Sequence, residues 1–437
     1  MSELDRPKLR PLAARRVEHG EESLVVLEDP HRLAESPVVL AFDVYVHVVR
    51  HFNGRNSLLD IQGLAFRSTL QYLELSAIRQ LVEQLDRALA LEGPRFDAAV
   101  RAFRESPLRP AALAGRAYSK EPALLADDIA RLFRGPGGAG APALPAPNGR
   151  GAKGAARPGS RLRAVLSPHI DFHRGGPVYT WAYKNLVEQS DAELFVILGV
   201  AHQPCKRRFV LTRKDFDTPL GVVKTDQDYI DRLAEAAGPH LFDDELTHRS
   251  EHSVEFQAVF LKHAMGDRPF AIAPILVGSF HDLLARGVDP MTDPEVSRFV
   301  EALRRVERES GRRVAYIGGV DLCHVGPEFG DPEPVDAQLR SRIRSFDHAL
   351  LSRAEAADPS GWFQTVAEVG DRWRVCGLAA TYTMLRALGP CRGELLKYDQ
   401  AVDERGSCCV SFASMAFHSI DGDEGKVPTP PLISKGG

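Results

Sequence analysis

The chain has 437 residues, of which 44% are hydrophobic and 26% are charged, and its formal net charge is −4. These proportions are ordinary for a globular protein, and they exclude wholesale disorder, collagen-like sequence and small disulfide-rich scaffolds. The chain has no overall basic excess with which to neutralise phosphates or anionic lipid, so we expect neither nucleic acid nor a membrane as its partner. The length allows two or three domains.

No stretch approaches the roughly 20 apolar residues of a membrane-spanning helix, and residues 1–20 lack the apolar core of a signal peptide. The six cysteines are scattered, apart from the adjacent Cys408 and Cys409, and this is not the spacing of a disulfide framework. We therefore expect a protein of the reducing cytoplasm.

The N-terminal quarter predicts a small module over residues 20–110, preceded by a disordered segment over residues 1–19. Apolar runs at 23–27 and 38–40 predict strands, and a longer run at 42–52 predicts a helix that ends at Asn53-Gly54. Ser57 can cap a helix that begins near Leu58. Apolar residues then recur at helical spacing until Gly93-Pro94, where we expect the helix to stop: Ile78, Leu81, Val82, Leu85 and Leu89. Helices with a short β element predict a winged-helix-like α+β module.

The charge of this module bears on its partner. Residues 21–95 carry 7 Lys and Arg against 11 Asp and Glu, which disfavours DNA and favours the docking of a peptide or protein. In the order of its elements the module resembles the PqqD-type peptide-recognition domains. A packing or dimerisation module is the alternative.

Residues 135–160 separate the first third of the chain from the rest. This stretch contains 8 Gly, 5 Pro and 7 Ala, which together make 20 of its 26 residues. Such a segment buries too little apolar surface to offset its ordering entropy, so we expect it to be flexible. We also expect residues 421–437 to form a disordered tail.

Beyond residue 160, β-rich apolar runs alternate with helical patterns; the runs lie at 164–166, 194–198, 270–277 and 314–317. This alternation predicts an α/β domain with a mainly parallel sheet covered by helices. Functional groups in such sheets collect just beyond the carboxyl ends of the strands. That edge of the sheet is therefore where a site is expected.

Polar side chains follow three of these strands directly. His169 follows the first strand, His202 follows the second, and Asp321 and His324 follow the last. Each lies beside Gly or Pro, as expected where backbones converge on a site. For any one of these residues alone, a structural hydrogen bond is the alternative.

Two further segments place reactive side chains at the start of helical stretches. His252 and Glu255 are three residues apart and thus share a helix face. Cys376 precedes the helical run 378–388, and the positive end of a helix favours a thiolate, the form that binds metal. His, Asp and Cys converging in this way predict a metal site.

At these positions the chain resembles the MEMO family, which supplies protein B of the AmmeMemoRadiSam gene sets. Its motifs match in order: residues 114–118 are similar to the family's A-G-x-W/F-Y, 167–169 to A-P-H, 197–202 to I-L-G-P-S-H, 251–255 to E-H-S-I-E, 321–326 to D-F-C-H-x-G, 376–377 to C-G and 411–417 to the closing V-S-Y-A-A strand. The resemblance places the MEMO domain at 111–420, with residues 135–160 as an insertion within it.

The resemblance implies the fold of class III extradiol dioxygenases, which are non-haem iron enzymes. It also implies a metal-ligand set of two histidines and one cysteine, which maps onto His169, His202 and Cys376. Iron(II) is the expected ion, and copper or zinc are alternatives for two imidazoles and a thiolate.

Around the metal, the resemblance implies four catalytic or orienting groups: His252, His324, Asp321 and Glu255. The two histidines, with ordinary pKa values of about 6.5, could move protons. The two carboxylates would orient these rings, or alternatively only satisfy buried donors.

The function expected from the sequence is a metal-dependent redox or oxygenase-type oxidoreductase of the MEMO family. Its substrate would be a small molecule, or a peptide presented by the N-terminal module, and a partner protein from an AmmeMemoRadiSam gene set is also expected. The alternative is a non-catalytic protein that binds a metal or a peptide in the same cleft.

Overall fold

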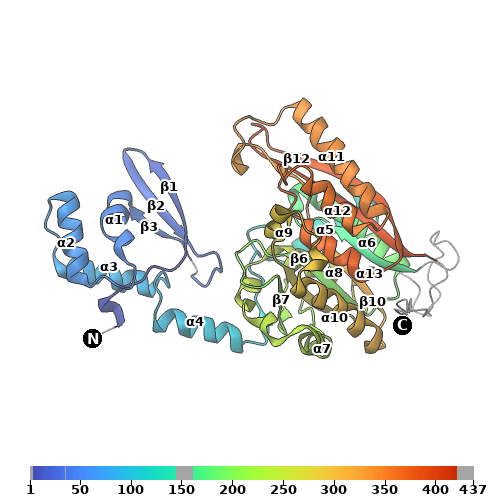
Figure 1. The fold of residues 1–437 in the computed structure, drawn as a ribbon, viewed down its shortest axis with the longest axis horizontal. Helices are drawn as coiled ribbons and strands as arrows, with labels where there is room; N and C mark the ends of the chain where they lie inside the picture. Colours follow the sequence, from blue (N-terminus) through green and yellow to red (C-terminus); the bar gives the residue numbers. More distant parts are fainter. Residues whose placement is uncertain (1–2, 35, 144–160, 421–437) are drawn as a thin grey trace, which may run out of the picture.

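The computed structural model describes residues 3–34, 36–143 and 161–420 (Figure 1). The predicted tail at 421–437 and most of the predicted flexible stretch at 135–160 lie outside the described residues. The N-terminal module contains a three-stranded antiparallel sheet in the order β1-β2-β3. Its strands and helices are β1 (Ala13–His19), β2 (Glu22–Glu28), β3 (Val38–Ala41), α1 (Phe42–His47), α2 (Leu58–Thr69) and α3 (Leu75–Arg87). The winged-helix-like assignment of this module stays a prediction.

Strand β1 lies in the segment that we expected to be disordered. It pairs with β2 along its whole length, from Ala13 opposite Glu28 to His19 opposite Glu22. Its side chains are almost all exposed, so no apolar alternation marks it in the sequence. Backbone pairing with β2 is what orders it.

Two helix boundaries in the module show how far local signals reach. Ser57 caps α2 as predicted, because its hydroxyl accepts the Asp60 N–H and the Asp60 carboxylate accepts the Ser57 N–H. Gly93-Pro94 does not stop a helix: α3 already ends at Arg87, and Pro94 begins α4 (Pro94–Glu105). Proline is favoured at the first helical position, where its missing N–H costs nothing. Helix α4 leads from the module to the large domain (Figure 1).

The large domain is built on an eight-stranded sheet in the order β11-β13-β5-β10-β6-β9-β7, with β12 paired to β13. The central strands β5, β10, β6 and β9 are parallel, whereas β13 and β7 flank them antiparallel. The mainly parallel arrangement that we expected therefore describes the centre of a mixed sheet. The strands are β5 (Leu162–Ser167), β6 (Leu194–Val200), β7 (Phe209–Leu211), β9 (Ala271–Val277), β10 (Val314–Gly319), β11 (His324–Val325), β12 (Cys391–Val402) and β13 (Cys409–Ser419), and a separate pair joins β4 (Leu108–Arg109) to β8 (Asp215–Phe216).

Helices cover both faces of this sheet. Alternate residues of the central strands enter opposite cores, with Val196 and Leu198 on one side and Phe195 and Ile197 on the other. Helices α5, α6 and α8 pack on one face, and α7, α10, α12 and α13 pack on the opposite face (Figure 1). The helices are α5 (Pro122–Arg134), α6 (Phe172–Gln189), α7 (Gln227–Ala237), α8 (His252–Met265), α9 (His281–Arg286), α10 (Pro294–Ser310), α11 (Ala337–Glu355), α12 (Pro359–Ala367) and α13 (Leu378–Leu388). Within the described ranges, no helix combines the length and apolarity needed to cross a bilayer.

Candidate metal centre

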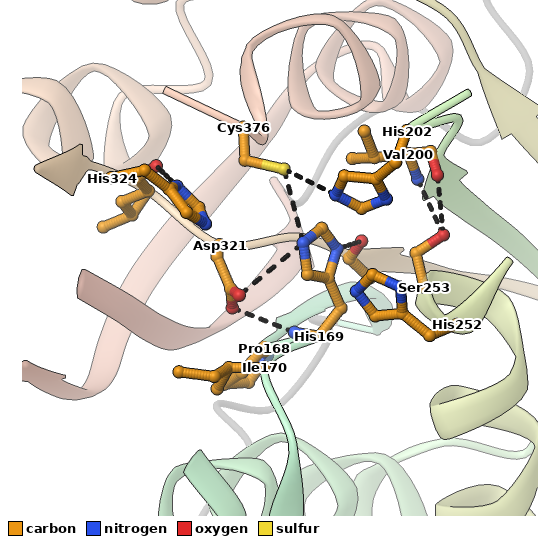
Figure 2. A network of polar contacts seen from close by, with 12 residues as sticks. Pro168, His169, Ile170, Val200, His202, His252, Ser253, Asp321, His324 and Cys376 are labelled. Carbon is orange, nitrogen blue, oxygen red and sulfur yellow. Dashed lines mark hydrogen bonds and ion pairs between the residues drawn. The ribbon is translucent and has the colours of Figure 1, made fainter. Parts of the chain in front are cut away.

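The carboxyl ends of three neighbouring strands bring the candidate side chains together (Figure 2). His169 lies two residues beyond β5, His202 two residues beyond β6, and Asp321 two residues beyond β10. Because β10 pairs in parallel with both β5 and β6, these three ends meet at one edge of the sheet. The edge predicted from the sequence is thus the one where these side chains lie.

His169 is buried and held in one tautomer. Its Nδ1 lies 2.9 Å from the Gly319 carbonyl, which can only accept, so Nδ1 carries the proton and Nε2 is left for a metal. Its backbone N–H donates to Asp321 Oδ1 at 3.0 Å, and Asp321 Oδ2 lies 3.6 Å from Nε2. Burial raises the pKa of the Asp321 carboxyl to about 7, against the lowering effect of the backbone hydrogen bonds that it accepts.

His202 is oriented by Glu251, a buried carboxylate. Glu251 accepts the His202 backbone N–H at 2.9 Å and lies 3.0 Å from Nδ1, so that Nε2 again faces the site. Burial alone would lower the pKa of His202, but the charges of Glu251 and Cys376 outweigh it and hold this pKa well above the ordinary value. A histidine–carboxylate pair of this kind is the usual support of a metal-binding imidazole.

Cys376 reaches the two rings because its backbone packs against the segment that follows β10. The Cys376 N–H donates to the Leu322 carbonyl at 3.0 Å, and the Gly377 N–H donates to the Asp321 carbonyl at 2.8 Å. A Cβ at residue 377 would lie 2.7 Å from that Asp321 oxygen, so this close approach requires glycine.

The Cys376 sulfur lies 3.3 Å from His169 Nε2 and 3.3 Å from His202 Nε2 (Figure 2). The structure thus brings together the three predicted ligands. Burial raises the pKa of the Cys376 thiol, although the neighbouring His202 opposes this. Within the described residues, His202 is thus the neighbour that favours the thiolate form that we expected at Cys376.

The ring of His252 lies beside the rings of His169 and His202. Its ring centroid is 5.1 Å from that of His169 and 4.6 Å from that of His202. A ligand nitrogen from each of these three histidines can be chosen so that all lie within 4.8 Å of one another, which makes the trio a group able to hold a metal ion. Burial lowers the pKa of His252 to about 4, so the ring is neutral, as a ligand must be.

A cavity of about 310 Å³ opens beside His202, His324 and Cys376. His324, the first residue of β11, has Nδ1 3.1 Å from the Leu322 carbonyl, and burial lowers its pKa to about 4. Apolar side chains form most of the remaining wall: Val200, Val277, Phe280, Phe329, Val375 and Leu378. The cavity suits a compact apolar group held against the candidate ligands.

Glu255 faces away from these rings. Its fully buried carboxylate contacts the Arg109 guanidinium and the Tyr118 hydroxyl, and it accepts the Leu113 N–H at 2.9 Å. Both of its oxygens are used in this way. The structure therefore gives Glu255 the alternative role of satisfying buried donors, and the catalytic or orienting role stays a prediction.

Two parts of the site were missed in the sequence. The first part is Glu251, which directly precedes His252 and caps the N-terminus of α8. A carboxylate at such a position accepts backbone N–H groups, and this was the signal that could have identified it in the sequence. The second part is a chain of Ser279, His281 and Asp371 in the cavity wall. His281 Nδ1 lies 2.5 Å from Ser279 Oγ, and Nε2 lies 2.6 Å from Asp371 Oδ2. This hydrogen bond to Asp371 raises the pKa of His281.

Comparison with known proteins shows which family of proteins the chain is similar to. The family model described as Memo-like protein matches residues 109–416. A MEMO1 family protein of Aquifex aeolicus is 26% identical over 400 residues, which cover 90% of this chain and 96% of the relative. A MEMO1 family protein of Methanopyrus kandleri is 31% identical over 265 residues, covering 59% of this chain and 83% of the relative. The Aquifex match is longer than the part of the chain from residue 109 onward, so that similarity extends into the N-terminal module.

Proposed function

Because the chain belongs to the Memo family, we propose that it is a metal-dependent redox or oxygenase-type protein whose ion is held by His169, His202 and Cys376. The convergence of three donor atoms carries this proposal, since the sulfur lies 3.3 Å from both Nε2 atoms. Bonds of about 2.0 Å to nitrogen and about 2.3 Å to sulfur, at a near-tetrahedral angle, hold such atoms about 3.5 Å apart. The donor set and its spacing therefore fit a single ion.

Iron(II) is the ion we propose, with copper or zinc as alternatives that the same ligands accept. A bound iron or copper ion would supply electron transfer and open coordination positions. We further propose, from the family resemblance, that the fold is that of the class III extradiol dioxygenases.

The residues of the chain prepare the site for such an ion. Gly319 and Glu251 keep a proton on Nδ1 of His169 and of His202, so Nε2 faces the site in both rings, and a bound ion would displace the second proton of His202. The mostly apolar cavity is large enough to admit a small molecule or a peptide side chain. His281, which contacts both Ser279 and Asp371, can exchange a proton with a group in the cavity through Ser279, whereas burial lowers the pKa values of His252 and His324 to about 4.

One observation favours the alternative of a non-catalytic metal site. His252 could add a fourth donor to the three ligands, since its nitrogen lies within the same cluster. Structural metal sites use four protein ligands, whereas catalytic sites keep one position open. A closed site would bind its ion without turning over a substrate.

The test is metal analysis of the anaerobically purified full-length protein after reconstitution with iron(II), together with His202→Ala and Cys376→Ala variants. Stoichiometric iron in the parent, loss of iron in both variants and oxygen consumption by the loaded parent are expected. Stable iron without any reaction with oxygen would favour the closed site. Failure of the parent to retain any metal would exclude both metal functions.

A further inference from the structure

The loop between β2 and β3 in the N-terminal module contacts the segment of the Memo-like domain that precedes Glu251. This loop, residues 29–34, is held in shape by Asp29, which accepts the backbone N–H groups of His31, Leu33 and Ala34 at 3.1, 2.8 and 3.1 Å. Asp29 also pairs with Arg10 at 2.9 Å, and both side chains are only 3% exposed. A buried, fully hydrogen-bonded ion pair of this kind fixes one conformation of the loop.

The tip of the loop adopts a backbone conformation that needs such support. Arg32 has φ +51°, in the left-handed region that residues other than glycine rarely occupy. Such a conformation persists only where the surroundings hold it. The loop is therefore built to present its carbonyl groups in a defined direction.

Those carbonyl groups accept hydrogen bonds from the two residues that precede Glu251. Ser250 Oγ donates to the Pro30 carbonyl at 2.7 Å, and the Arg249 guanidinium donates to the carbonyls of His31 and Arg32. The Arg32 side chain in turn donates to the Ala112 carbonyl at 3.1 Å. The loop is thus fastened to the large domain at two places.

The segment that it fastens is the one that orients the metal ligand. Arg109 holds the same segment from within the large domain, since it donates to the carbonyls of His248 and Glu251 at 2.8 and 2.9 Å. The Glu251 carboxylate then accepts hydrogen bonds from the backbone N–H and from the ring Nδ1–H of His202. The path from module to ligand runs from the loop through Arg249 and Ser250 to Glu251 and His202.

We infer that residues 29–34 are a positioning element of the metal site: by holding Arg249 and Ser250 they fix the Glu251 carboxylate, and with it the tautomer and direction of His202. The N-terminal module then acts on the site in cis, as part of the machinery that sets the affinity and geometry of the bound ion. This inference rests on the proposed metal site.

The experiment is an anaerobic Co(II) titration of the full-length protein, followed by its visible ligand-field spectrum. Arg249→Ala and Ser250→Ala should each weaken Co(II) binding about tenfold, as loss of outer partners of a ligand does, and should shift the Co(II) bands. Asp29→Asn, which lies within the module and touches no ligand, should shift the bands in the same direction. Arg249→Lys and Ser250→Thr, which keep a donor, should restore the parent spectrum.

Arg232→Ala is the matched control, because Arg232 is a surface arginine of α7 paired with Asp228 of the same helix. It should leave both the Co(II) affinity and the spectrum unchanged. Parent-like titrations and spectra for Arg249→Ala and Ser250→Ala would overturn this inference alone. Absence of Co(II) binding by the parent would overturn it together with the metal site.

Discussion

At the scale of single residues, the site depends on where two imidazole protons lie. The Nδ1–H of His169 donates a hydrogen bond to the Gly319 carbonyl, and the Nδ1–H of His202 donates a hydrogen bond to Glu251. A backbone carbonyl cannot be removed by substitution, but the carboxylate can. Glu251 is therefore the residue through which the preparation of the ligands is most directly tested.

Glu251→Gln should weaken metal binding by about 10- to 100-fold, because the amide no longer supplies the charge that fixes and strengthens the His202 ligand. Competition with a chromophoric chelator measures this change. Glu235→Gln, an exposed substitution on α7, is the matched control and should bind as the parent does. Equal affinity of the Glu251 variant and the parent would show that this carboxylate does not support a ligand.

His281 makes the stability of the protein depend on pH near neutrality. Its pKa in the folded state is raised by the hydrogen bond to Asp371, so the pair contributes stability that is full below the ordinary value of about 6.5 and is lost as the pH rises through the folded value. The free energy of unfolding should therefore fall as the pH rises above about 6.5 and through the raised pKa of His281.

This decline should be smaller in His281→Asn, which cannot titrate, when urea unfolding is compared across the same pH range. Selective NMR of the histidine ring should show a pKa above the ordinary value in the parent and a lower one in Asp371→Asn. A His281 pKa at or below the ordinary value in the parent would contradict the assignment.

At the scale of elements, the buried Arg109–Glu255 pair joins the start of the Memo-like domain to α8. Both side chains are fully buried, and removal of one partner leaves the other charge without compensation. Glu255→Gln should lower the free energy of unfolding by about 3 kcal/mol. The exposed pair between Asp127 and Arg131 on α5 is the control, and Asp127→Asn should cost less than about 1 kcal/mol.

Urea unfolding of the two variants checks this comparison. Metal binding by the folded Glu255 variant should match that of the parent, because Glu255 contacts none of the candidate ligands. A variant that is as stable as the parent but does not bind metal would support the role at the site that we first predicted for Glu255.

Elements with strong local signals could be predicted from the sequence, and those ordered by distant contacts could not. The apolar runs that form β5, β6, β9 and β10 are buried on both faces, so they stand out. Strand β1 presents exposed side chains and is ordered only by its pairing with β2. The hairpin of β12 and β13 adds antiparallel strands beside β5 and so makes the sheet mixed. The sequence of the parallel central strands gives no sign of this addition.

At the scale of the whole molecule, the site is assembled from strand ends, helix starts and a loop of the N-terminal module. The three predicted ligands could be found because His169 and His202 follow strands that the sequence marks, Cys376 precedes a marked helix, and each lies in a family motif. The approach of His252 to His169 and His202 could not be predicted, because it depends on how α8 packs on the sheet. The chain of Ser279, His281 and Asp371 joins residues about ninety positions apart without any motif.

The same scale decides which third side chain joins His169 and His202 in holding the ion, Cys376 or His252. A centre with His169, His202 and Cys376 includes a sulfur ligand and leaves room for a substrate, whereas the three-histidine group contains nitrogen only. The two arrangements share two ligands, so loss of metal in a His202 variant does not separate them. The identity of the third donor atom does.

X-ray absorption spectroscopy of the anaerobically reconstituted full-length protein measures that atom directly. We predict one sulfur scatterer at about 2.3 Å from the metal, which is lost in Cys376→Ser while the nitrogen scatterers remain. A metal surrounded by nitrogen and oxygen alone in the parent would contradict the assignment of Cys376 as a ligand, and with it the centre that we propose.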